Sequence, residues 1–156
     1  MDWEIQLVAL GEILLAMLLG GLIGYERETA QKPAGLRTHM LVGGAAALLV
    51  ALGNSIIASF DATVPMQNLN TDPIRVIEAI IVGISFLGAG TIFRRERRDE
   101  VEGLTTAASI LFTAGVGIAV ALGEFVLAVG STILVLIVMR VLGLLEIRLI
   151  NKDEAS

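Results

Sequence analysis

The stretch IQLVALGEILLAMLLGGLIGY, residues 5–25, decides the fold of this chain. A helix needs roughly 20 apolar residues to cross a hydrocarbon layer about 30 Å thick. Lipid offers no partners to unpaired backbone groups, so the sequence predicts a transmembrane helix here. The acidic start Met1-Asp2-Trp3-Glu4 is unlike the basic leader of a signal peptide, and we expect this helix to be retained.

Four more apolar runs of similar length follow the first one. The chain is 55% hydrophobic and 17% charged, whereas soluble domains carry roughly 25% charged residues. We therefore predict an all-α membrane protein, a single bundle of five transmembrane helices over residues 1–150. The expected helices are 5–25, 39–60, 75–93, 104–122 and 125–145, followed by a short tail over 151–156.

The basic residues between these runs predict the orientation, because positively charged connections stay on the cytoplasmic side. They occur in alternate connections and in the tail: Arg27, Lys32 and Arg37, then Arg94, Arg95, Arg97 and Arg98, then Arg148 and Lys152. The amino terminus is therefore expected outside and the carboxyl terminus in the cytoplasm.

An offset of 68 residues aligns parts of the first two helical runs with the third and fourth. The identical residues are Leu19, Gly20, Arg27, Glu28, Gly35, Leu36 and Thr38, which match Leu87, Gly88, Arg95, Glu96, Gly103, Leu104 and Thr106. One interpretation is a parallel repeat of two hairpins, a device known in transporters. The other is a composition that membrane hairpins share.

Small residues on the first run predict close helix packing. Glu12, Ala16, Gly20 and Gly24 recur every four residues, and the last two form a GxxxG motif. Gly83, Gly88 and Gly90 are assigned the same packing role on the third run. Glu12 is expected to point into the contact, where a carboxylate costs at least about 2.5 kcal/mol and so marks a functional candidate. The alternative is that Glu12 reaches the outer headgroups.

The third run begins with a cluster of ionisable residues. Asp72 can cap the helix, and Arg75 and Glu78 stand one turn apart, where they can form a pair. This cluster is either a cation entry site or polar lock, or a capped and solvated helix start.

Polar residues also gather at the expected cytoplasmic ends of the helices. They are Glu26, Arg27, Lys32, Arg37, Thr38 and His39 in the first connection, and Thr105 and Thr106 at the start of the fourth helix. Anchoring of topology accounts for Arg27 and Lys32, while Arg37 and His39 lie at a helix start that favours anions. The mixed charges from Arg94 to Glu102 are interpreted as a solvated loop, with contact to anionic lipid or a partner as the alternative.

Several function classes find no support in the sequence. There is no cysteine, no Walker loop, and a single histidine, so we expect no metal site and no cofactor. The net charge of −5 argues against nucleic acid as a partner.

Three motifs resemble the MgtC/SapB family of bacterial membrane proteins. They are Lys32-Pro33-Ala34-Gly35-Leu36-Arg37-Thr38-His39-Met40-Leu41-Val42, Phe86-Leu87-Gly88-Ala89-Gly90 and Gly103-Leu104-Thr105-Thr106-Ala107-Ala108. The resemblance implies an inner-membrane protein linked to growth under low magnesium and to survival of pathogens inside phagocytes. It implies no enzyme, and inhibition of the proton-translocating ATP synthase is the family's proposed mechanism. The family's polar pattern falls on Glu12, Glu26, Arg27, Lys32, Arg37, Thr38, His39, Asp72, Arg75, Thr105 and Thr106.

The chain departs from the family pattern in places and resembles its short members. Ala79 and Val82 stand where Gln and Ser are common, which puts a shared ligand path on the third helix in doubt. The end at Ser156 is similar to members without a cytoplasmic carboxyl-terminal domain.

Two functional hypotheses follow, with a lipid-binding or self-assembling scaffold as a third option. The first is a non-enzymatic regulatory protein that docks a membrane partner, such as ATP synthase, through small-residue helix faces and Glu12. The second is a small magnesium or proton-linked cation transporter or channel that uses Glu12, Arg75 and Glu78. In either case we expect a homodimer in the lipid bilayer, because small-residue faces need a partner surface.

Overall fold

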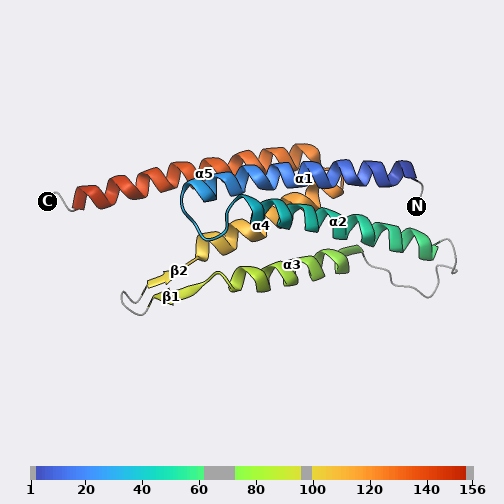
Figure 1. Ribbon diagram of the computed structural model, residues 1–156, viewed down its shortest axis with the longest axis horizontal. Coiled ribbons are helices and arrows are strands. Elements are labelled where there is room, and N and C mark those ends of the chain that lie inside the picture. The colour runs from blue at the N-terminus through green and yellow to red at the C-terminus, as the bar shows by residue number, and fades with distance from the viewer. Residues whose placement is uncertain (1–2, 62–72, 96–99, 154–156) are drawn as a thin grey trace.

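The computed structural model describes residues 3–61, 73–95 and 100–153, with the side chains of 3–58, 74–93 and 101–143. Five helices and one pair of short strands make up these segments (Figure 1). In chain order they are α1 (Trp3–Thr29), α2 (Leu36–Asp61), α3 (Pro73–Ala89), β1 (Phe93–Arg95), β2 (Glu100–Glu102), α4 (Leu104–Ala121) and α5 (Phe125–Asp153).

Four of the described helices are long and apolar enough to cross a bilayer. The spans are Trp3–Thr29, Leu36–Ala58, Leu104–Ala121 and Phe125–Gly143. The helical prediction is therefore confirmed, and the chain is a multi-pass membrane protein. Helix α3 has 17 residues, which at 1.5 Å per residue gives about 26 Å. This is shorter than the hydrocarbon layer, so a fifth crossing stays a prediction.

The connection from α3 to α4 differs from the prediction. Helix α3 ends at Ala89 and not at residue 93, because the chain leaves the helix in a turn where the Thr91 hydroxyl donates to the Gly88 carbonyl at 2.7 Å. The expected solvated loop contains an antiparallel strand pair, with Phe93 opposite Glu102. Gly103, the residue before α4, has a φ of 92°, and a Cβ there would collide with the Thr91 carbonyl. Only glycine closes this connection without strain.

Two of the helix ends are closed by the same backbone motif. After α1, the amides of Gln31 and Lys32 donate to the carbonyls of Glu28 and Arg27. After α4, the amides of Gly123 and Glu124 donate to Val120 and Ala119 in the same pattern. This is the Schellman arrangement, whose left-handed residue is Gln31 at φ 55° and Gly123 at φ 77°. At both places the motif reverses the direction of the chain sharply, which places α2 against α1 and α5 against α4.

Helices α1, α2 and α4 form the centre of the bundle. Helix α3 packs on the side of α2 and α4, and α5 packs along α4 and α1. The α1 to α2 turn, the strand pair and the carboxyl-terminal end of α5 lie at one end of the molecule, opposite the amino terminus (Figure 1). The side of the membrane at which each end lies stays a prediction, as does the internal repeat.

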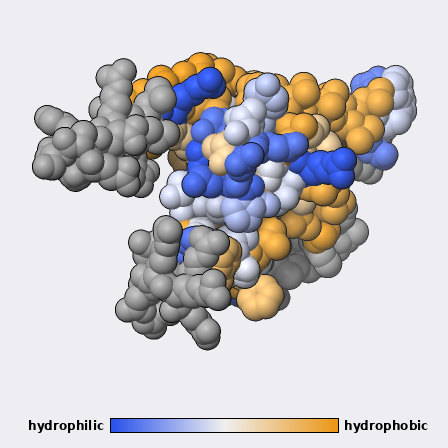
Figure 2. Space-filling model, turned by 60° about the vertical axis from the view of Figure 1, so that its left-hand side comes forward, coloured by the Kyte–Doolittle hydropathy of each residue, from blue (hydrophilic) through white to orange (hydrophobic). Residues whose placement is uncertain are grey.

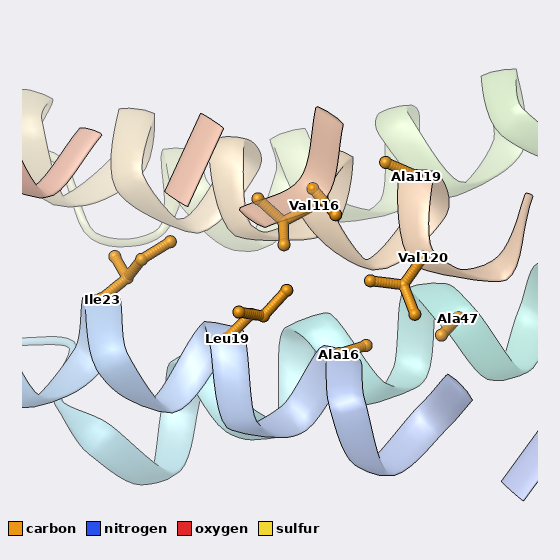
Figure 3. Packing of buried hydrophobic residues seen from close by; sticks show 8 residues of the cluster. Ala16, Leu19, Ile23, Ala47, Val116, Ala119 and Val120 are labelled. Carbon is orange, nitrogen blue, oxygen red and sulfur yellow. The ribbon is translucent and has the colours of Figure 1, made fainter. Parts of the chain in front are cut away.

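The core is built from small and branched apolar side chains. Ala16, Leu19 and Ile23 of α1 face Val116 and Val120 of α4 across a narrow gap between the helix axes (Figure 3). Large apolar residues lie mostly outside, and only 11% of the span of α5 is buried. Such a belt is the surface that hydrocarbon chains cover, because the interior of each helix bonds its backbone groups internally.

Glycines set how closely the central helices approach. A Cβ on Gly20 would stand 2.5 Å from the carbonyl oxygen of His39, and one on Gly24 would stand 2.7 Å from the Cα of Leu36. Gly88 faces Ala107 of α4 at 3.5 Å. Gly83 has no atom within 4 Å of its Cβ position, and Gly90 meets only carbonyls of its own turn, so a packing role for these two glycines stays a prediction.

Candidate functional site

Helix geometry turns Glu12 away from the face on which Gly20 and Gly24 contact α2. In this part of α1, Met17 and Ile13 are the side chains nearest to the Cβ position of Gly44 on α2. The four-residue spacing explains this, because 3.6 residues make one turn and each step of four rotates about 40° further round the helix. After three steps from Gly24, Glu12 has left the contact face. It is half-buried, one turn beyond Ala16, and forms no ion pair with the described residues.

The polar residues of α3 face outward. Arg75 and Glu78 are both exposed and line an open hollow of about 720 Å³ together with Ala79, Val82 and Gly83. No ion pair joins Arg75 to Glu78 within the described residues, so the predicted pair is not formed. The two side chains lie on the same face of α3 without an ion pair between them. Asp72, the third member of the predicted cluster, lies outside the described residues.

Glu28 closes the start of α2. Its Oε2 accepts a hydrogen bond from the Leu36 amide at 2.8 Å, which satisfies one of the free donors of the helix start. Glu28 also lines a hollow of about 280 Å³ with Gly35, Arg37 and Thr38. Glu28 is therefore a carboxylate that lies beside Arg37 at this helix start.

Replacing Glu28 by alanine is expected to lower the free energy of unfolding by about 1 kcal/mol, the usual effect of losing a helix cap. The Glu28→Gln variant keeps an acceptor oxygen and should recover about half of this loss. The midpoint of unfolding by SDS in mixed micelles, followed by circular dichroism, measures both. Equal stability of Glu28→Ala and the unchanged chain would contradict the capping role.

His39 is fully buried between α1, α2 and α4. Its Nδ1 lies 2.9 Å from the carbonyl oxygen of Gly35, and its Nε2 lies 3.0 Å from the hydroxyl of Ser109 on α4. The Ser109 hydroxyl in turn lies 2.8 Å from the carbonyl oxygen of Thr106. A continuous chain of hydrogen bonds therefore links the start of α2 to the first turns of α4.

The hydrogens available in this series of hydrogen bonds link the protonation of the His39 ring to the direction of the Ser109 hydroxyl. A carbonyl only accepts, so Nδ1 must donate to Gly35. Ser109 has a single hydroxyl hydrogen, which goes either to Nε2 of a neutral ring or to Thr106. In the second case Nε2 must donate, and the ring carries a positive charge. The direction of the Ser109 hydroxyl and the protonation of the His39 ring therefore depend on each other.

A third group of predicted residues meets at the same end of the molecule. Arg27 is 5% exposed and donates from Nε to Glu26 Oε2 at 2.5 Å. Both line a hollow of about 530 Å³ that also contains Lys32 and Thr105. Figure 2 shows hydrophilic residues gathered on this face between apolar flanks. The sequence places these residues on three separate segments, and the fold brings them together.

Two residues of these sites were missed as candidates from the sequence. Ser109 is the hydrogen-bond partner of His39, and Arg140 of α5 lines the hollow of Arg27. Arg140 does stand out in the sequence as a lone basic residue near the end of an apolar run. Nothing in the sequence pairs Ser109 with His39, which lies 70 residues away. Thr106 is buried beside them, while Thr105 is exposed.

The described residues contain no group of three or more histidine, aspartate or glutamate side chains that could hold a metal ion. Magnesium keeps most of its waters and needs only one or two carboxylates. Single carboxylates, among them Glu12, Glu28 and Glu78, are therefore the kind of acidic group that the described residues offer to such an ion.

Known proteins resemble this chain over most of its length. An uncharacterised protein of Haemophilus influenzae is 39% identical over 141 residues, which are 90% of this chain and 58% of that protein. "Putative magnesium transporter YhiD" of Escherichia coli K12 is 35% identical over 141 residues, 90% of this chain and 63% of its own length. Protein MgtC of Salmonella typhimurium LT2 is 42% identical over 124 residues, 80% of this chain and 48% of its own.

The chain thus spans about half to two thirds of the length of these relatives. No solved structure matches it. The sequence profile of the MgtC family matches residues 13–148, a range that includes Arg27, His39, Ser109 and Arg140. The protein therefore belongs to the MgtC family.

Proposed function

We propose that this chain is a non-enzymatic regulatory protein of the bacterial inner membrane that acts by docking another membrane protein, in a process linked to magnesium supply. The half-buried carboxylate of Glu12 carries the proposal. It sits on an apolar helix with no ion pair among the described residues. An intramembrane carboxylate in this state is costly unless a partner covers it.

The surroundings of Glu12 support docking. Leu7, Val8, Leu10 and Leu14 are all more than half exposed around it. Ala16, one turn further along, belongs to the same cluster as Val120, which is close to the end of α4. The part of α1 before Glu12 therefore extends past α4 and offers an unoccupied apolar surface. Gly20 and Gly24, by contrast, are already buried in the contact with α2 and are not available to a partner.

The interior of the bundle supports a role other than transport by a single chain. Where α1, α2 and α4 meet, Gly43 approaches the carbonyl of Ala16, and Gly117 approaches the carbonyl of Gly43. Backbones in contact leave no room for a hydrated ion between these three helices. Magnesium in particular gives up its waters reluctantly.

Co-purification from native membranes tests the docking proposal. We expect the full chain to recover a membrane complex, with ATP synthase as the first candidate, and Glu12→Ala to reduce the recovery at least tenfold. Glu124→Ala removes an exposed carboxylate from the connection between α4 and α5, outside this surface, and serves as the matched control. The same set of partners recovered in the same amounts with Glu12→Ala would overturn the proposal.

A small cation transporter is the second candidate, favoured by the open hollow that Arg75 and Glu78 line on α3. The name of the YhiD relative also refers to magnesium transport. Such a transporter would need a second copy to complete a pathway along this face. Magnesium or proton flux into proteoliposomes, compared with Glu78→Gln, distinguishes the two functions, and no flux above empty vesicles removes this candidate.

A further inference from the structure

The hollow between α1, α4 and α5 has the features of a binding site that neither proposed function uses. It has a volume of about 530 Å³ and lies where α1 ends and α4 begins. Its polar side holds Arg27, Lys32 and Arg140, with Glu26 as the one carboxylate. Three cations against one anion leave a net charge of +2 around the hollow.

Arg27 points unpaired hydrogen-bond donors into this hollow. Its side chain is 6% exposed, and within the described chain only its Nε is bonded, to Glu26. No buried side-chain nitrogen or oxygen of the described residues lacks a hydrogen-bond partner. The two terminal nitrogens of Arg27 must therefore reach open space, and the hollow is the space that Arg27 lines. A guanidinium group with a free fork suits the paired oxygens of a phosphate.

The start of α4 adds further donors to the same place. Gly103 precedes the helix and gives no side-chain cap to its free amides. Thr105, in the first turn, lines the hollow. An uncapped helix start attracts anions through its amides and its dipole, and here it opens beside Arg27.

The opposite wall of the hollow is apolar. Val138, Met139 and Leu142 of α5 line it, and Val138 and Leu142 are more than half exposed toward the hydrocarbon region. A soluble phosphate compound would leave this wall uncovered, whereas an acyl chain would cover it. We infer that the hollow binds an anionic phospholipid, with the phosphate held by Arg27, Lys32 and Arg140 and an acyl chain lying along α5.

Lipid titration of the purified full chain in detergent, followed by native mass spectrometry, tests this site. We expect phosphatidylglycerol to bind at least tenfold more tightly than phosphatidylcholine with the same acyl chains. Arg140→Gln and Lys32→Gln should each weaken phosphatidylglycerol binding about fivefold, the usual contribution of one basic residue near an anionic membrane surface. Arg37→Gln removes the same charge from an exposed position outside the hollow and should bind as the unchanged chain does.

The possible results separate the lipid from a soluble phosphate source and from general charge. Displacement of phosphatidylglycerol by glycerol 3-phosphate or inorganic phosphate at millimolar concentration would overturn the lipid assignment. An equal loss of binding in Arg37→Gln would show attraction by overall charge only and would overturn the site. Glu12 lies 15 residues before Arg27 on α1, about 22 Å away along the helix. Glu12→Ala should therefore leave lipid binding intact, and the docking and lipid proposals can fail separately.

Discussion

Replacing Gly117 by leucine is expected to unfold the helical bundle, whereas the same change at Gly115 leaves it folded. A Cβ on Gly117 would collide with the carbonyl oxygen of Gly43 and stand 3.1 Å from the Cβ of Ala46. Backbone atoms cannot rotate away as a side chain can, so α2 and α4 would have to separate. We expect the free energy of unfolding to fall by at least about 3 kcal/mol, the upper end for an overpacked core.

Gly115 provides the matched control on the same helix. It is exposed and has no atom within 4 Å of its Cβ position, so leucine there extends only into the surrounding lipid. Unfolding by SDS in mixed micelles compares the two variants directly. If Gly117→Leu and Gly115→Leu unfold at the same SDS fraction, α2 and α4 do not meet as described.

Replacing His39 by leucine is expected to lower the free energy of unfolding by about 2 kcal/mol. The change leaves the volume nearly constant but removes the hydrogen bonds to Gly35 and Ser109. Hydrogen bonds between membrane helices contribute about 0.6 kcal/mol on average and up to about 1.7 kcal/mol. The fully buried position of His39 places it toward the upper value, because the stranded groups reach no water.

Ser109→Ala and the double variant complete a thermodynamic cycle for this bond. We expect Ser109→Ala to cost about 1 kcal/mol, and the double variant to cost less than the sum, by a coupling of about 1 kcal/mol. The same SDS unfolding assay measures all four proteins. Additive losses would falsify the bond between His39 and Ser109, even if His39→Leu alone is destabilising.

Two details at the helix ends separate what the sequence predicts from what it does not. The apolar runs predicted the helices, but they did not predict that α3 ends at Ala89 or that a strand pair follows it. Length and hydropathy do not indicate this turn, because it depends on interactions of Thr91 and Gly103. In the same way, the four-residue spacing correctly predicted that Gly20 and Gly24 pack closely, but it also assigned Glu12 to their face. A helix has 3.6 residues per turn, so residues four apart shift progressively around it.

The sequence by itself determined that this is a membrane protein, where its apolar helices lie, and to which family it belongs. Those properties depend on local composition, on the need to bond every backbone group in lipid, and on contiguous motifs. Only the tertiary structure decided that His39 meets Ser109, that Arg27 and Arg140 share one hollow, and that Arg75 and Glu78 do not pair. These contacts depend on how the helices are rotated and how closely they approach each other. Side-chain contacts between helices produce no repeating pattern in the sequence.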